Sequence, residues 1–146
     1  MDEPAVQVLE VRSAAGERPV TITAAVSAQA SQAIYTALSE QLDRRRRNAA
    51  ATAEDLLALR EQMALVERFQ ALAAARAHAI VSLSDSELRA CLLELTDYAD
   101  RVDGEHFQPT DLRERLKTIA EVTPVLWDAN AAAAAAARES IPHPTP

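Results

Sequence analysis

Glycine is almost absent from this chain: only Gly16 and Gly104 occur among its 146 residues. Glycine supplies the positive φ angles that tight turns need, and it weakens the interiors of helices and strands. A chain with so little glycine is expected to consist of long elements joined by few flexible loops. We expect one turn at each glycine. The scarcity also excludes the glycine-rich loops that cradle phosphates in nucleotide-binding proteins.

The composition indicates one domain with a small hydrophobic core. Hydrophobic residues make up 49% of the chain, but aromatic residues make up only 3%, and much of the remainder is alanine. Alanine buries little apolar area, and burial contributes only about 25 cal/mol per Å². The length fits a single domain. Close helix packing or self-association would compensate for the small core, and we expect self-association.

Net charge and cysteine content limit the classes of partner and the cellular compartment that we expect. The formal net charge of −7 opposes a nucleic-acid-binding protein as a whole, although it allows a local basic patch. Cys91 is the single cysteine, so no internal disulfide can form, which fits a reducing compartment. The acidic N-terminus lacks the apolar stretch of a signal peptide. We expect a cytoplasmic protein that does not contact a membrane.

Two short runs near the N-terminus have the pattern of β-strands. Residues 6–11 and 20–24 are rich in β-branched side chains and alternate with a period of two. Residues 12–19 contain serine, glycine and proline, so we expect a β-hairpin segment over residues 1–26. An isolated two-stranded hairpin is marginally stable in water. It must therefore pack on the helices or pair with another chain, and the sequence leaves both open.

The rest of the chain favours helix. We expect a mainly α fold in which the hairpin precedes an elongated antiparallel bundle of four or five helices over residues 27–139, with a disordered tail over residues 140–146. The predicted helices cover residues 27–47, 53–81, 85–102, 110–122 and 125–138. Thr52 and Asp55 resemble a capping sequence, so we expect a break near residue 50, although one continuous helix is the alternative.

Two further signals mark helix boundaries. Ser84 and Glu87 form a capping box, in which each side chain binds the backbone N–H of the other residue, so a helix is expected to begin there. Pro124 lacks an N–H and clashes with the preceding turn. With Thr123 as the cap, Pro124 is expected to begin a fresh helix, and a kinked continuous helix is the alternative.

The predicted helix over residues 53–81 carries the longest apolar stripe. At 1.5 Å per residue it would be about 43 Å long, which is long for a domain of this size and indicates coiled-coil-like pairing. The stripe consists of Leu56, Leu59, Met63, Val66, Ala73, Ala77 and Ile80, widened by Leu65, Phe69 and Leu72. We expect oligomerisation through this helix or through the hairpin.

Four consecutive arginines, Arg44, Arg45, Arg46 and Arg47, are the strongest charge feature. Guanidinium groups suit phosphate oxygens, so the run is a candidate interaction site. Four consecutive positions spread around a helix, however, and no aromatic residue lies among them. The simpler interpretation is a solvated helix end that is partly paired with Glu40, Asp43, Glu54 and Asp55.

Trp127 is the single tryptophan and the second candidate interaction residue. It would serve as an anchor for a protein partner if its ring is exposed. The alternative, which we favour, is that the ring closes the core between the last two predicted helices, because large buried area is scarce in an alanine-rich chain.

No pattern predicts a catalytic, metal or cofactor site. Cys91 lies on an apolar stripe, and buried cysteines are usually inert. A nucleophilic Cys91 would need a histidine close to it, and His106 is the candidate. The acidic stretch in and just after the third predicted helix lacks calcium-loop spacing, and we expect it to form a solvated face. These acidic residues are Glu94, Asp97, Asp100, Asp103 and Glu105.

These observations favour a non-enzymatic binding or assembly protein that needs no cofactor. It would be a small adaptor, accessory subunit or structural component that self-associates or binds a protein partner. The alternative is a nucleic-acid-associated regulator that uses the four arginines. An enzyme built on Cys91 and His106 is the weakest hypothesis.

Overall fold

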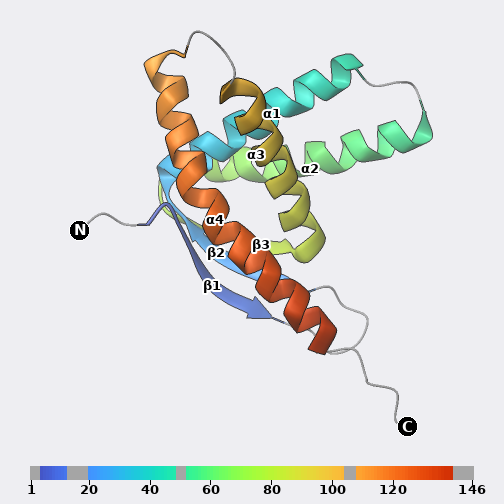
Figure 1. The fold of residues 1–146 in the computed structure, drawn as a ribbon, viewed down its shortest axis with the longest axis vertical. Helices are drawn as coiled ribbons and strands as arrows, with labels where there is room; N and C mark the ends of the chain where they lie inside the picture. The colour runs from blue at the N-terminus through green and yellow to red at the C-terminus, as the bar shows by residue number, and fades with distance from the viewer. Residues whose placement is uncertain (1–3, 13–19, 49–51, 104–107, 140–146) are drawn as a thin grey trace.

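The described part of the chain folds into four helices and a three-stranded sheet (Figure 1). The computed structural model describes residues 4–12, 20–48, 52–103 and 108–139, without the side chains of residues 137–139. In chain order the elements are β1 (Val6–Arg12), β2 (Thr21–Val26), α1 (Ala28–Asn48), α2 (Ala53–Ala75), β3 (Ala79–Ser84), α3 (Asp85–Asp103) and α4 (Thr110–Glu139). The predicted mainly helical class is confirmed. The turns expected at Gly16 and Gly104 and the tail over residues 140–146 lie outside the described residues.

The predicted hairpin strands pair antiparallel, and a third strand joins them. The strand order is β1-β2-β3, with Ile22 opposite Leu83 and Ala24 opposite Val81. The prediction that residues 53–81 form one helix is wrong at its C-terminal end. Arg76 has a left-handed backbone (φ 50°, ψ 35°) that ends α2, and the following residues pair with β2 instead. The hairpin thus gains its third strand from the same chain.

One face of the sheet is buried in the core, and the other face is turned toward solvent. Ile22, Ala24, Val81 and Leu83 are buried, whereas Ile80 and Ser82, which alternate with the last two, are exposed. A bulge between Val8 and Glu10 shifts the alternation of β1 by one residue. Val6, Val8 and Val11 therefore all contact the core.

The four helices pack on one another and on the buried sheet face. Helix α4 lies along β1, and α3 lies against β3; Figure 1 shows α4 crossing the strands. Helices α1 and α2 pack side by side as a helical hairpin that reaches away from the sheet. The apolar stripes of α1 and α3 are buried. Their fully buried members include Ala30, Ile34, Leu38, Leu88, Leu92 and Leu95.

Local capping places two helix boundaries where the sequence predicts them. The break between α1 and α2 is confirmed: the Thr52 hydroxyl accepts a bond from the Asp55 N–H (3.1 Å). The capping box is also confirmed: the Glu87 N–H donates to Ser84 Oγ (3.1 Å), and the Ser84 N–H donates to Glu87 Oε1 (3.0 Å). Both caps satisfy backbone donors that a helix start leaves unpaired.

The predicted fresh helix at Pro124 does not occur, because α4 runs from Thr110 to Glu139 with Pro124 inside it. Proline removes one helical hydrogen bond and crowds the preceding turn. The hydroxyl of Thr123 donates to the carbonyl of Ile119 (2.9 Å), one turn back. The described residues therefore contain four helices, the lower of the two predicted counts.

Candidate interaction surfaces

The four arginines lie in the last turns of α1, and the first two differ from the last two in having ion-pair partners among the described residues. Arg45 binds Glu94 of α3 with two hydrogen bonds, and Arg44 lies 3.8 Å from Asp97 of the same helix. Arg46 and Arg47 have no ion-pair partner within the described part of the chain. The predicted pairing with Glu40, Asp43, Glu54 and Asp55 is wrong for Arg44 and Arg45, because both side chains reach across to α3.

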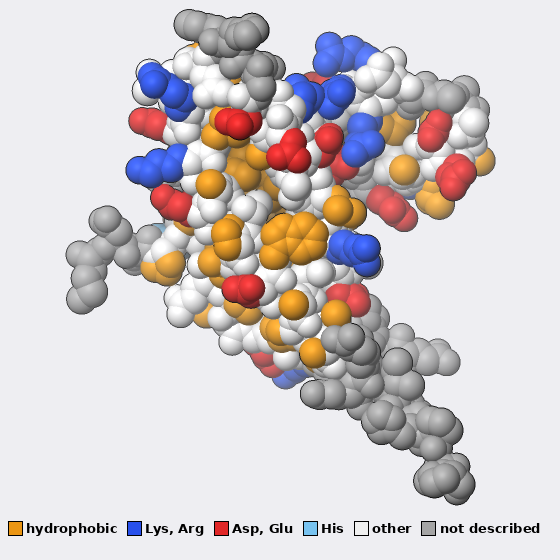
Figure 2. Space-filling view, viewed as in Figure 1, with side chains coloured by type: hydrophobic (Ala, Val, Ile, Leu, Met, Phe, Trp, Pro, Cys, Tyr) orange, Lys and Arg blue, Asp and Glu red, His pale blue; other side chains and the backbone are white. Residues whose placement is uncertain are grey.

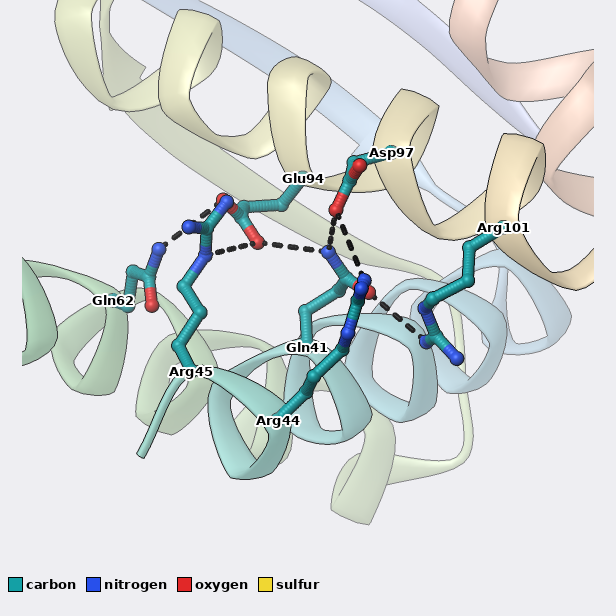
Figure 3. A network of polar contacts seen from close by, with 7 residues as sticks. All are labelled: Gln41, Arg44, Arg45, Gln62, Glu94, Asp97 and Arg101. Carbon is teal, nitrogen blue, oxygen red and sulfur yellow. Dashed lines mark hydrogen bonds and ion pairs between the residues drawn. The ribbon is translucent and has the colours of Figure 1, made fainter. Parts of the chain in front are cut away.

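Glu94 is the centre of the polar network in Figure 3. The residue as a whole is almost fully buried, at 7% exposure. Arg45 Nε donates to Glu94 Oε2 (3.1 Å), Gln41 donates to the same oxygen (3.2 Å), and Gln62 donates to Oε1 (3.1 Å). Hydrogen bonding to Glu94 also raises the pKa of Arg45 above its ordinary value. Glu94 thus holds α1, α2 and α3 together.

The expectation of a solvated acidic face is therefore wrong for Glu94, although Asp97, Asp100 and Asp103 are exposed. A buried carboxylate needs a cation and full hydrogen bonding, and Glu94 has both. Its position, three residues after the buried Cys91 and on the same side of the helix, was the available signal in the sequence. Glu105 lies outside the described residues.

A surface pocket of about 520 Å³ lies where α1, α3 and α4 meet. Arginines from all three helices line it, but so do three carboxylates. The charged lining residues are Arg44, Arg47, Arg101, Arg115, Glu40, Asp43 and Asp111. Arg115 lies 3.9 Å from Glu40 and donates to the Tyr98 hydroxyl (3.0 Å). Because the charges nearly balance, this pocket gives the nucleic-acid alternative little support, and that alternative stays a prediction.

Trp127 lies at the surface of α4, where it is 37% exposed, rather than in the buried core. It lines a pocket of about 420 Å³ between α3 and α4, whose walls include Leu95, Ala99 and Ile119. Figure 2 shows hydrophobic side chains exposed along this boundary. Asp100 and the exposed Asp103 add negative charge to its rim.

The outward face of α2 is a further surface, which we define by Leu56, Leu57 and Met63. Their exposed fractions are 60%, 58% and 37%. The sequence prediction placed Leu56 and Met63 on the same apolar stripe as Phe69 and Ala73, but the face that packs inward contains Leu65, Phe69 and Ala73. Charge separates the two faces. Arg60 and Glu67 lie on the exposed face, whereas the inward row, in which residues are spaced four apart, contains no charged residue.

Cys91 is buried in the core. Burial, and to a lesser degree the negative charge of Glu94, raises the pKa of its thiol to about 12. Only the thiolate is a nucleophile. His106, the proposed partner in the enzyme hypothesis, lies outside the described residues.

We expect folded protein to react with a thiol reagent near pH 8 about a hundred-fold or more slowly than free cysteine. The rate is measured with an aromatic disulfide reagent whose released thiolate absorbs light. The same protein in guanidinium is the control, because unfolding exposes the thiol and lowers its pKa towards the ordinary value. Rapid reaction of the folded protein would contradict the buried placement.

Within the described residues, no group of three or more histidine, cysteine, aspartate or glutamate side chains could hold a metal ion. None of the helices in that part of the chain combines the length and apolarity needed to cross a membrane. Comparisons with protein-family models, curated proteins and solved structures gave no match.

Proposed function

We propose that this chain is a non-enzymatic helical assembly protein that binds protein through the outward face of α2. It would act as a small adaptor, accessory subunit or structural component. The observation that carries the proposal is the exposure of Leu56, Leu57 and Met63 within about two turns of one helix. Single exposed hydrophobic residues are ordinary on protein surfaces, whereas grouped ones are typical of interaction sites.

The position of this face also supports the proposal. Helix α2 belongs to the helical hairpin that reaches away from the sheet (Figure 1), so a partner can approach it along its length. Figure 2 shows hydrophobic and charged side chains together over this part of the molecule. Apolar contacts ringed by charge suit a soluble protein partner. The cytoplasmic location predicted from the sequence belongs to the same proposal.

Serine at Leu56, Leu57 and Met63 is expected to abolish association at high micromolar concentration while the protein stays folded. The reason is that these side chains are exposed in the folded chain and become buried only against a partner. Sedimentation velocity over a concentration series measures association, and far-UV circular dichroism measures folding.

The matched control carries serine at Leu9, Ile80 and Leu93, which are also exposed but lie on β1, β3 and α3. This control should associate like the wild type. Equal association of the wild type and the α2 variant would show that binding does not use this face.

A further inference from the structure

We infer that the partner of this α2 face is a second copy of the chain, paired antiparallel with it about a two-fold axis. The inference rests on the proposed function and names its partner. The observation that supports the inference is the order of large, small and charged side chains along this face. Its large apolar residues all lie in its N-terminal half, and most of its alanines lie in its C-terminal half. Each half also carries one charge, Arg60 in the first and Glu67 in the second.

Residues of this face recur every three or four positions, and all of them are exposed. They are Ala53, Leu56, Leu57, Arg60, Met63, Ala64, Glu67, Gln70, Ala71 and Ala74. Arg60 and Glu67 lie seven residues apart, near the middle of the face, which is too far for them to pair within one helix. Neither has an ion-pair partner among the described residues. Both charges are therefore available to a partner.

In an antiparallel pairing centred between Met63 and Ala64, each charge on this face lies opposite a charge of the other sign on the second copy. Arg60 of one copy then lies opposite Glu67 of the second copy, and the two-fold axis repeats the contact. The same register places Leu56 opposite Ala71, and Ala53 opposite Ala74. Leu56 and Met63 thus each meet an alanine, and Leu57 lies opposite the longer Gln70. The alanines let the helices approach closely.

A parallel pairing of the same face would be unfavourable. Arg60 would lie opposite its own copy, and so would Glu67, which juxtaposes like charges. Leu56 would meet Leu56 at one end, and Ala71 would meet Ala71 at the other, so the helices would be held apart at one end. Charge and size thus select the antiparallel arrangement, and two-fold symmetry is the commonest form of self-association.

Charge reversal tests the register directly. Arg60→Glu is expected to weaken self-association about ten-fold, because it removes both ion pairs and adds repulsion twice. Glu67→Arg should weaken it similarly. The double variant R60E/E67R restores opposite charges across the interface and should recover the wild-type dissociation constant within about three-fold. Sedimentation equilibrium measures all four proteins.

Matched controls are Arg113→Glu and Glu121→Arg on α4, which are exposed and change the net charge equally. They should leave self-association unchanged. Dimers that tolerate R60E and E67R singly would overturn this register, while loss of association in the Leu56, Leu57 and Met63 variant would still support the proposed function. A wild-type monomer at high micromolar concentration overturns the inference.

Cysteine cross-linking tests the direction of pairing. Ala64→Cys lies beside the two-fold axis and should form a disulfide-linked dimer under a mild copper oxidant. Ala53→Cys should not, because its two copies lie about 31 Å apart along the helices, far beyond disulfide reach. The double variant A53C/A74C should cross-link. Cross-linking by A53C alone indicates parallel pairing and overturns the inference. Cys91 contributes no background because it is buried.

Discussion

Truncation of Phe69 to alanine is expected to destabilise the protein by about 3 to 5 kcal/mol. The ring is only 2% exposed and joins α2 to the core beneath the sheet. Phe69 and Tyr98 are the aromatic members of that buried cluster, so the ring supplies a large share of the apolar area that holds α2. The internal cavity that it lines with Ile22, Leu88 and Cys91 has a volume of only about 10 Å³, so the packing around the ring is close.

Urea unfolding followed by circular dichroism measures the effect. Because small domains are stable by only about 5 to 15 kcal/mol, this loss is a large share of the total, and the urea midpoint of the variant should fall well below that of the wild type. Phe69→Leu should cost about 1.5 kcal/mol or less, because it keeps most of the volume. Leu57→Ala is the matched control on the exposed side of α2 and should stay within about 0.5 kcal/mol of the wild type. A cost for Phe69→Ala as small as that of Leu57→Ala would contradict the packing of α2.

The contrast between Phe69 and Leu57 explains why the sequence predicted α2 only in part. Apolar residues occur around most of this helix, so three-to-four spacing alone does not distinguish the inward side from the outward side. Leu65, Phe69 and Ala73 form a row along the inward side of the helix that contains no charged residue. Arg60 and Glu67 lie on the opposite, exposed side. Charge position therefore distinguishes the two faces where apolar spacing does not.

Strand β3 was missed for a different reason. Residues 79–84 alternate only briefly, and Ile80 also continues the helical spacing of α2. What decides their conformation is pairing with β2, in which Ser82 lies opposite Thr23, 59 residues earlier in the chain. Such a contact between distant segments leaves no local pattern. The caps at Thr52 and Ser84 were predictable because their partners lie three residues away.

The arginine run shows the same limit at a candidate site. Its charge and its place at the end of α1 were predictable, but its partners on α3 were not. Glu94 lies 49 residues after Arg45, and nothing in the local sequence relates them. A run that suggests phosphate binding is thus partly a fold-stabilising contact.

Replacement of Arg45 by alanine is expected to destabilise the protein by about 2 to 3 kcal/mol. Loss of one partner from a buried ion pair costs about 3 to 5 kcal/mol, because it leaves a buried charge uncompensated. The Arg45 side chain is 47% exposed whereas that of Glu94 is 9% exposed, so solvent screening reduces the loss. Gln41 and Gln62 still donate to the carboxylate but cannot balance its charge.

The matched control is Arg46→Ala, which removes the neighbouring exposed arginine and should change the free energy of unfolding by about 0.5 kcal/mol or less. Glu94→Gln removes the buried charge, so R45A/E94Q should be more stable than R45A alone. A double-mutant cycle from urea unfolding then gives the coupling between the two side chains, which we expect to be about 1 kcal/mol or more. Equal effects of R45A and R46A would contradict this role for Arg45. If both substitutions changed the free energy of unfolding by about 0.5 kcal/mol or less, the whole arginine run would be a solvated helix end.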